Sequence, residues 1–377
     1  MPRSPAPDRR KYGPPLVRWF AQAGRELPWR SAGPRDPYRV WISEAMLQQT
    51  RVATVIDYYG RFVTRFPDVH SLSKASEAEV LQLWSGLGYY RRARLLHAGA
   101  CAVVERHAGR FPATRAELEA LPGIGPYTAG AIASLAFDAP EPLVDGNVER
   151  VFARLFRIEA AQASAELRRR SWELARVLCP EQGAGAWNEA LMELGALICT
   201  PREPRCEQCP LSAVCEARHS GRAKELPLPR QRPEPFAVEL EVLCARAGGR
   251  LLFCRRPAEG RMAGLWELPT RECVSVGTPT RLYPDHWDAR LREQRLRCRE
   301  HDGTAGGEPI RVRHSITCHR IRATLVEGEL DHAPQGEDWQ WRTLAEASSL
   351  GLTGMTRKLV RAMERAEREH ERSAKKA

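Results

Sequence analysis

Leu121-Pro-Gly-Ile-Gly-Pro-Tyr-Thr-Ala129 places two glycines immediately before an apolar helix. Gly123 and Gly125 let the backbone approach a ligand closely, because glycine has no Cβ atom. The helix that begins here offers free backbone amides and the positive end of its dipole to a phosphate. A Gly-x-Gly turn alone is usually a plain connection between helices, but together with a helix expected over 115–120 it indicates a helix-hairpin-helix. Such a hairpin predicts a DNA anchor that does not read base sequence.

Around this hairpin, residues 14–225 are predicted to be mainly helical, and the first domain is expected to comprise residues 1–224. Apolar residues at helical spacing over 50–66 predict an amphipathic core helix. Asp36 followed by a proline predicts the start of another helix, which continues to about Gln49 and contains Glu44. Further helices are expected over 76–84, 91–107, 126–136, 147–157, 164–178 and 184–198. The first domain is therefore predicted to be all-α.

A second domain of a different class follows a linker. Residues 225–235, ELPLPRQRPEP, are rich in proline, which disfavours both helix and central strand. Beyond them, FAVELEVLCA and GRLLFCRR are typical of the two strands of a hairpin, and β-like stretches recur near 310–328. A last helix is expected from Met355 to about Glu371. Residues 236–377 are thus predicted to form an α+β domain.

Charge and polarity narrow the possible partners. The 377-residue chain has a formal charge of +11, from 58 Lys and Arg against 47 Asp and Glu. This excess favours a polyanionic partner, because neutralising phosphates releases counterions.

The sequence shows no signal for a membrane or for export. No apolar run reaches the roughly 18 residues of a membrane span. The start, MPRSPAPDRRKYGPP, lacks the apolar core of a secretory signal. We therefore expect a cytoplasmic protein without a membrane segment.

Four of the eleven cysteines lie close together, at Cys199, Cys206, Cys209 and Cys215. Without an export signal a disulfide framework is not expected, and thiolate ligation of a metal centre is. Four thiolates satisfy either zinc or a 4Fe-4S cluster, and the spacing of the cysteines does not separate the two. The loop 199–215 is therefore a predicted metal site of either kind.

Two carboxylates occupy positions suited to catalysis. Asp145 precedes Asn147 at the start of a predicted helix, where the ordinary role of an Asp is to cap the helix or form a turn. Helical spacing places Glu44 on one face with Trp41 and Gln48, so an aromatic surface would bury its carboxyl group and raise its pKa by desolvation. A partly exposed surface Glu is the common alternative. These residues alone leave both alternatives open.

In their fixed order, the motifs resemble the MutY-type adenine glycosylases of the helix-hairpin-helix glycosylase superfamily. The resemblance extends from about Leu16 into the C-terminal domain. The segments that match the family are LPWR (27–30), DPYRVWISEAMLQQT (36–50), GLGYYRRAR (86–94), LPGIGPYTAGAI (121–132), VDGNVERV (144–151), NEALMELGALICT (188–200) and the cysteine loop. The resemblance implies a helical catalytic domain over 1–224 that holds one 4Fe-4S cluster, rather than zinc, on its four cysteines.

The resemblance also implies a pocket for a flipped adenine. Glu44 resembles the family's catalytic acid and Asp145 its second carboxylate. A protonated Glu44 would let adenine leave as a neutral base, and an ionised Asp145 would stabilise the cationic sugar until water attacks. The other pocket residues implied by similarity are Tyr127, Asn147, Arg25, Leu27, Trp29, Arg30 and Glu189.

A further set of residues is implied to recognise the lesion, because the target base must leave the stack to be reached. Gln49, Thr50, Leu87 and Tyr89 match family positions that probe or wedge beside 8-oxoguanine. The segment 251–269, LLFCRRPAEGRMAGLWELP, resembles the family's Nudix-like domain. No acidic metal-binding helix follows it, so we expect recognition of the oxidised base rather than pyrophosphatase activity.

The recognition loop of the second domain departs from the family pattern. The family usually has Phe-Ser-His or a close variant there, whereas this chain has His314-Ser-Ile-Thr-Cys-His319. Thr317 retains a hydroxyl for the oxidised base, since Ser and Thr share donor and acceptor capacity. Cys318 is a weak hydrogen-bond partner compared with His.

These features favour a monofunctional adenine DNA glycosylase over two alternatives. Endonuclease III-type glycosylase/lyases share the hairpin, the Asp and the cluster but carry a Lys where Tyr127 stands, and that amine is needed for a Schiff base. A non-catalytic iron-sulfur protein that binds DNA or senses redox state gives no reason for Glu44 and Asp145. The expected substrate is double-stranded DNA with adenine opposite 8-oxoguanine or guanine. We expect a monomer that works on the nucleoid.

Overall fold

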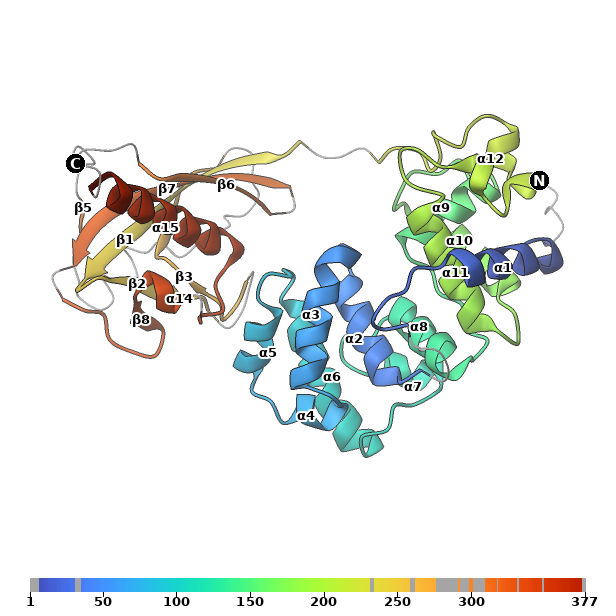
Figure 1. Cartoon of the computed structure of the whole chain (residues 1–377), viewed down its shortest axis with the longest axis horizontal. Coiled ribbons are helices and arrows are strands. Elements are labelled where there is room, and N and C mark those ends of the chain that lie inside the picture. Colours follow the sequence, from blue (N-terminus) through green and yellow to red (C-terminus); the bar gives the residue numbers. More distant parts are fainter. Residues whose placement is uncertain are drawn as a thin grey trace. The chain divides into compact units, whose positions relative to one another are not determined.

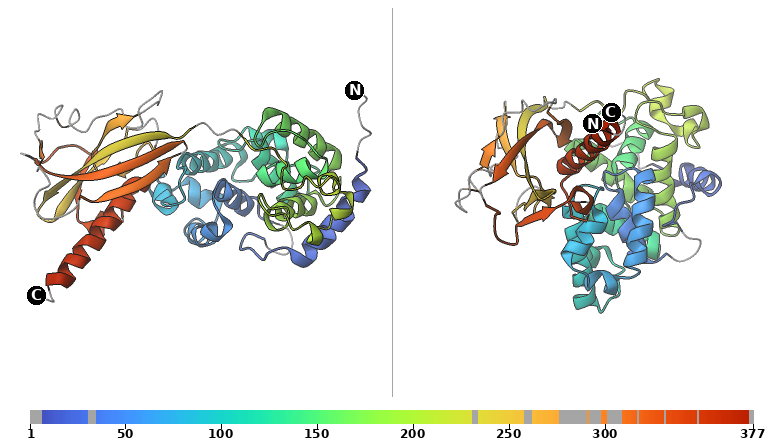
Figure 2. Two further views of the ribbon diagram at one scale, coloured as in Figure 1. Left: turned by 90° about the horizontal axis from the view of Figure 1, so that it is seen from above. Right: turned by 60° about the vertical axis from the view of Figure 1, so that its left-hand side comes forward.

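The computed structural model describes residues 7–30, 35–230, 234–257, 262–275, 291, 298–300, 309–316, 318–330, 332–347 and 349–374. They belong to two compact units. The first comprises Met1–Leu83 and Arg91–Gln231, and the second comprises Trp84–Tyr90 and Arg232–Ala377. The first unit consists of helices and the second is built on a β-sheet (Figures 1 and 2).

The helices of the first unit confirm the predicted all-α class. They are α1 (Gly13–Ala23), α2 (Pro37–Leu47), α3 (Val52–Arg65), α4 (Val69–Ser73), α5 (Glu77–Trp84), α6 (Arg91–His107), α7 (Arg115–Glu119), α8 (Pro126–Phe137), α9 (Gly146–Leu155), α10 (Ala165–Leu178), α11 (Ala184–Leu197) and α12 (Glu216–His219), with 3-10 turns η1 (Arg9–Lys11), η2 (Cys206–Gln208) and η3 (Ser212–Val214). None of the described helices is long and apolar enough to cross a lipid bilayer.

Helices α8 and α11 form the centre of the first unit. Every residue of α8 from Thr128 to Ser134 is buried, and α11 is buried over most of its length. A helix that is apolar on all sides belongs inside the core. Helices α2, α9 and α1 pack around this pair, and Val148, Val151 and Phe152 of α9 join the same apolar cluster as residues of α11. The ends of α2, α8 and α9 are thereby brought together.

The connection between α7 and α8 is the predicted helix-hairpin-helix. Gly123 has a φ of +78°, which favours glycine, and a Cβ there would lie 2.7 Å from Cβ of Leu95. Gly125 is the N-cap of α8 and Pro126 its first residue. Both positions at the start of α8 are exposed to solvent. The backbone amides at this helix end are therefore accessible to a ligand.

Helix α2 ends two residues earlier than the sequence predicts, at Leu47 instead of Gln49. Arg92 of α6 explains this early end. Its Nη1 atom donates to the carbonyl oxygens of Ala45, Met46 and Gln48 at 2.7, 3.0 and 2.6 Å. These carbonyls would otherwise remain unpaired at a helix C-terminus. Gln49 follows with a φ of +59°, so the chain turns sharply immediately after the helix.

The second unit contains a mixed eight-stranded sheet. Its strands are β1 (Phe236–Ala247), β2 (Arg250–Arg255), β3 (Trp266–Glu267), β4 (Thr270–Ser275), β5 (Cys298–Glu300), β6 (Arg311–Ile316), β7 (His319–Leu330) and β8 (Trp339–Arg342). The main path runs β3-β2-β1-β7-β5, with β4 on β1, β6 on β7 and β8 on β2. Strands β1 and β7 are parallel, whereas the other pairs are antiparallel.

Two predictions for this unit are confirmed. Strands β1 and β2 form the expected hairpin, and Gly248 and Gly249 turn it with φ values of +54° and +73°. The last helix, α15 (Gly354–Ala374), lies along one face of the sheet (Figures 1 and 2). A short helix, α14 (Leu344–Ala347), precedes it. The core consists of the inward-facing strand residues packed against α15.

Candidate active site

A cavity of about 680 Å³ opens in the first unit where α2, α8, α9 and α11 converge. The segment that follows α1 forms one wall. Eleven residues singled out in the sequence line this cavity, namely Arg25, Leu27, Trp29, Arg30, Glu44, Gln49, Thr50, Tyr127, Asp145, Asn147 and Glu189. Five separate stretches of sequence thus meet in one site.

Glu44 lies on the buried side of α2, and only 5% of its surface is exposed. The hydroxyl of Tyr127, which α8 contributes, donates a hydrogen bond to Glu44 Oε2. Burial raises the pKa of Glu44 to about 7, and the nearby carboxylates of Asp145 and Glu189 act in the same direction. The Tyr127 hydrogen bond opposes the shift without cancelling it. Near neutral pH, Glu44 can therefore hold or give up a proton.

Helical spacing suggested Trp41 as the aromatic neighbour of Glu44, and the structure adds Tyr127, which contacts the carboxyl group directly. Trp41 packs edge-on against Phe111, with ring centroids 5.4 Å apart. The aromatic ring that hydrogen-bonds the carboxyl group belongs to Tyr127, 83 residues further along the chain. The expected desolvation is present, but a long-range contact supplies the aromatic partner.

Asp145 acts both as a helix cap and as part of the cavity wall. Its Oδ1 accepts a hydrogen bond from the backbone amide of Val148 at 2.7 Å, which caps α9. Its Oδ2 accepts from Asn147 Nδ2 at 2.8 Å. Burial raises the pKa of Asp145 above its ordinary value, and these two hydrogen bonds oppose the shift without cancelling it, because they favour the carboxylate. The capping role that the sequence left open is therefore real, and it fixes the carboxylate beside Glu44.

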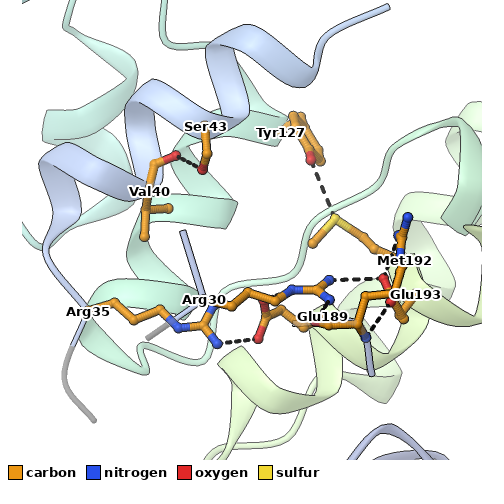
Figure 3. Close-up of polar contacts among 9 residues, drawn as sticks. Arg30, Arg35, Val40, Ser43, Tyr127, Glu189, Met192 and Glu193 are labelled. Atoms are coloured by element: carbon orange, nitrogen blue, oxygen red, sulfur yellow. Dashed lines mark hydrogen bonds and ion pairs between the residues drawn. The ribbon is translucent and has the colours of Figure 1, made fainter. Parts of the chain in front are cut away.

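A network of arginines and buried carboxylates holds the segment before α2 against α11 (Figure 3). Glu193 Oε1 accepts from Arg25 Nε at 2.7 Å, and Glu193 Oε2 accepts from Arg25 Nη2 at 2.8 Å and from Arg30 Nη2 at 3.0 Å. Glu189, one turn earlier on α11, accepts from Arg30 Nε at 3.0 Å and also from Arg35. Two acids on one helix face thus anchor three arginines.

The charge state of Glu193 follows from these contacts. Burial alone would raise its pKa, but the hydrogen bonds from Arg25 and Arg30 outweigh burial and lower the pKa to about 2. The side chain of Glu193 is 1% exposed, whereas that of Arg25 is 34% exposed. Glu193 is therefore a permanent anion inside the site.

Several cavity residues were missed by the sequence interpretation, including Arg35, Met192 and Glu193. Met192 Sδ lies 3.4 Å from the Tyr127 hydroxyl (Figure 3). The signal that could have identified Glu193 is its position four residues after Glu189, because two acids at that spacing share one face of a helix otherwise rich in apolar residues.

The four cysteines line a small cavity of their own with Arg154. Arg154 of α9 is 2% exposed, and its Nη1 donates to Cys199 Sγ at 3.3 Å and to the carbonyl of Thr200 at 2.7 Å. Burial raises the pKa of Cys209 to about 12, and the other three cysteines raise it as well because they lie nearby.

The cavity of the four cysteines has some, but not all, of the features expected of a metal site with thiolate ligands. Four thiols and a cation share one cavity, and a bound metal centre would favour their thiolate forms. Among the described residues, no three His, Cys, Asp or Glu side chains are already arranged to hold a metal ion. The cysteines are gathered, therefore, but do not form a finished coordination shell.

Other predicted residues lie outside the cavity. Leu87 and Tyr89 belong to the segment grouped with the second unit, where Leu87 is 6% exposed and Tyr89 is 54% exposed. Gly123 and Gly125 form the hairpin turn rather than the cavity wall. Thr317 falls outside the described residues.

Comparison with known proteins gives two family matches. Residues 42–176 match the HhH-GPD superfamily of base excision DNA repair proteins. Residues 241–362 match the NUDIX domain. The two matches fall on the helical part and on the sheet-containing part of the chain, respectively.

The chain as a whole is similar to adenine DNA glycosylases. It is 36% identical to the adenine DNA glycosylase of Rattus norvegicus, over 93% of this chain and 77% of that protein. With the adenine DNA glycosylase of Homo sapiens the identity is 39%, over 68% of this chain and 56% of that protein, so the chain spans little more than half of the human relative. Among solved structures, a thermostable thymine-DNA glycosylase is 30% identical, with a TM-score of 0.50 over 56% of this chain and 97% of that structure.

Proposed function

Because the chain belongs to the adenine DNA glycosylase family of base excision repair enzymes, we propose that it hydrolyses the bond between adenine and deoxyribose where adenine is mispaired with 8-oxoguanine or guanine. The observation that carries this proposal is Glu44, a buried carboxyl group with a pKa of about 7 beside Asp145. Two carboxyl groups with different environments are the arrangement expected for cleavage of a bond to a sugar.

The first step uses the proton of Glu44. Adenine is a poor leaving group as an anion, so the neutral carboxyl of Glu44 donates its proton to a ring nitrogen of the base. The bond from the sugar C1′ to the base then breaks, and its electron pair stays with the now neutral adenine. Hydrogen bonding from Tyr127 fixes the orientation of the carboxyl group.

The second step uses the charge of Asp145. Loss of adenine leaves an oxocarbenium-like sugar, which the Asp145 carboxylate stabilises electrostatically. The hydrogen bonds from Val148 and Asn147 favour the ionised form needed for this role. Water then adds to C1′ and passes a proton to the carboxylate that Glu44 has become. The products are free adenine and an abasic site.

Selection of adenine is assigned to the wall built by the arginine network. Leu27 and Trp29 lie in the segment between Arg25 and Arg30, and all four line the cavity. Glu189 and Asn147 add hydrogen-bonding groups to the same space. A pocket that matches the donors and acceptors of a flipped base discriminates strongly against bases that leave those groups unpaired.

Tyr127 supports a monofunctional enzyme. A glycosylase that also cleaves the strand needs an amine to form a Schiff base with the sugar, and a phenol cannot form one. The hydroxyl of Tyr127 is already engaged by Glu44. We therefore propose that the abasic site stays intact until alkali or heat is applied.

Recognition of the oxidised base is proposed for residues from both units. Gln49 and Thr50 lie at the sharp turn after α2, at the rim of the cavity. Leu87, Tyr89 and the hydroxyl of Thr317 are assigned to the same task by similarity. The Gly123–Gly125 turn is assigned to a DNA phosphate because the α8 amides are accessible.

We propose that Cys199, Cys206, Cys209 and Cys215 hold one 4Fe-4S cluster. When bound, the cluster would supply a covalent support for the loop 199–215. Arg154 would hold the first ligand through its hydrogen bond to Cys199 Sγ. A protein with these activities is expected to work as a monomer on genomic DNA in the cytoplasm.

Single-turnover assays on four duplexes test the proposal, with adenine placed opposite 8-oxoguanine, G, C or T. We expect rapid adenine release opposite 8-oxoguanine, slower release opposite G, and little opposite C or T. Strand breaks should form only after alkali, and borohydride should trap little covalent complex. Strand cleavage without alkali, trapped at a pocket residue, would favour a glycosylase/lyase instead.

A further inference from the structure

Four arginines gather on one face of the paired strands β6 and β7. The antiparallel register places Arg313 of β6 directly opposite Arg322 of β7. It also places Arg320 opposite Ser315, two residues further along β6. Arg311 lies two residues before Arg313, so it points to the same side of the sheet.

Alternation of buried and exposed residues identifies this side. Ile321, Ala323 and Leu325 of β7 are buried and share a core cluster with Leu359 and Met363 of α15. Residues between them on the strand must point the other way. All four arginines are exposed. They therefore stand on the face opposite α15, the helix seen along one side of the sheet in Figure 2.

The positive charge on this face is largely uncompensated. Arg322 forms an ion pair with Glu239 of β1 at 3.2 Å, between side chains that are 61% and 53% exposed. Within the described residues, Arg311, Arg313 and Arg320 have no ion-pair partner. Three positive charges thus remain, on neighbouring positions of a rigid strand pair.

Four clustered positive charges destabilise the folded domain unless an anion binds to them. Like charges directly opposite each other destabilise a strand pair, and here Arg313 faces Arg322. A flat strand surface with several guanidinium groups matches a row of phosphates, because each group donates two parallel hydrogen bonds to phosphate oxygens. The cluster is thus better suited to an extended polyanion than to a single small anion.

We propose that this arginine face, formed by Arg311, Arg313, Arg320 and Arg322, binds the phosphate backbone of duplex DNA. The choice of DNA among polyanions rests on the proposed function. The arginine face covers β6 and the first four residues of β7, so it adjoins the turn at Cys318 between the two strands, next to Thr317 in the sequence. Phosphate contacts fix register and orientation without reading sequence. They would thereby bring this turn onto the duplex.

The test measures how salt affects binding of the full chain to an undamaged duplex. Each phosphate contact makes the slope of log affinity against log salt steeper by about 0.9. We therefore expect the triple variant Arg311→Gln, Arg313→Gln, Arg320→Gln to bind with a slope that is shallower by about 2 to 3. Affinity at low salt should fall by at least tenfold.

Two matched variants show whether the effect depends on where the charge lies or only on how much charge is removed. Arg361, Arg365 and Arg368 are exposed on α15, on the other side of the sheet, and their replacement by Gln removes the same charge. This control should keep the wild-type slope to within about 0.5. A second variant with Lys at 311, 313 and 320 keeps the charges and should retain most of the slope.

An unchanged slope in the folded Gln variant would overturn the inference, and so would an equal loss in the α15 control. Circular dichroism and thermal melting of each variant show that it folds. Failure of the proposed function is a different result, namely no adenine release from any mispaired duplex. The salt slope reports the arginine face in either case, since undamaged DNA contains no substrate.

Discussion

At the scale of single residues, Glu44 and Asp145 share a buried space yet need opposite protonation states. The negative charge of Asp145 raises the pKa of Glu44, because a nearby like charge disfavours the ionised form. Hydrogen bonds resolve the competition, because Asp145 receives two hydrogen bonds that favour the anion. Among the described residues, the carboxyl group of Glu44 receives one side-chain hydrogen bond, from the Tyr127 hydroxyl. The side chain of Gln48, one turn further along, donates to Thr128 instead. These hydrogen bonds favour the proton on Glu44 and the negative charge on Asp145, as the proposed reaction requires.

The pKa of Glu44 predicts the alkaline limit of the reaction. A general acid is active only while protonated, so the single-turnover rate should fall as the pH rises through about 7. Rates measured between pH 5 and pH 9 on an A:8-oxoguanine duplex test this. The Glu44→Gln variant should bind the duplex but lose base removal at every pH. Residual activity within tenfold of wild type would remove Glu44 from its role as the acid.

At the scale of elements, α11 carries two acids whose spacing organises the cavity wall. Glu189 and Glu193 hold Arg25, Arg30 and Arg35, three residues that belong to no helix or strand. The folded pKa of Glu193, about 2, is below its ordinary value. Its charge therefore stabilises the fold at pH values above about 4.3, and this contribution is lost as the pH falls towards 2.

Glu193→Gln should loosen this wall. The amide keeps the shape but removes the anion that pairs with Arg25 and leaves Arg30 with Glu189 alone, so we expect a loss of about 1–3 kcal/mol in unfolding free energy. Adenine release should slow by at least tenfold. Denaturant unfolding and single-turnover rates measure the two effects. The matched control is Glu173→Gln on α10, whose ion pairs are half exposed and should contribute less than 1 kcal/mol. Equal effects of the two substitutions would contradict the anchoring role.

The loop of four cysteines leads to a prediction about the iron content of the purified protein. Protein purified without oxygen should be brown and contain about four irons for each chain. Replacement of Cys206 by Ser should lower the iron content and the thermal stability together, whereas Cys179→Ser on the buried end of α10 should leave iron unchanged. Zinc without iron in the purified protein would contradict the cluster assignment.

Element positions were predictable from the sequence wherever local signals determine them. The cap at Asp36, the Gly-x-Gly turn before α8 and the Gly248–Gly249 hairpin act over a few residues, and the structure has all three. The early end of α2 was not predictable, because Arg92 reaches it from a different helix. The contact of Tyr127 with Glu44 and the anchoring by Glu193 depend in the same way on side chains distant in sequence.

At the scale of the whole molecule, the chain combines an all-α unit that holds the candidate chemistry with a sheet unit related to the NUDIX domain. The family resemblance identified both from short motifs, since the order of motifs carries information that no single motif has. The resemblance did not predict the arginine face, because the pairing register of β6 and β7 brings its four arginines together.

Discrimination between 8-oxoguanine and guanine is expected to depend on the second unit. Thr317→Ala should lower the preference for 8-oxoguanine by up to about 1–3 kcal/mol, the range for loss of a specific base contact. Cys318→Ala should have a smaller effect, because a thiol is a weak hydrogen-bond partner. The ratio of single-turnover rates on the two duplexes is the measurement. A ratio unchanged in both variants would show that this turn does not read the lesion.

The double use of Asp145 has a consequence for inheritance. Asparagine has the same shape and is an equally good helix cap, so Asp145→Asn loses only the hydrogen bond from Asn147 and should leave the fold intact while removing the charge that the reaction needs. Cellular proteases and chaperones remove unstable chains and would spare this one. The mutant protein would occupy mispairs without repairing them and exclude a working copy, so the allele should behave as dominant. Mutation rates in cells that express both copies should then exceed those in cells that express the working copy alone.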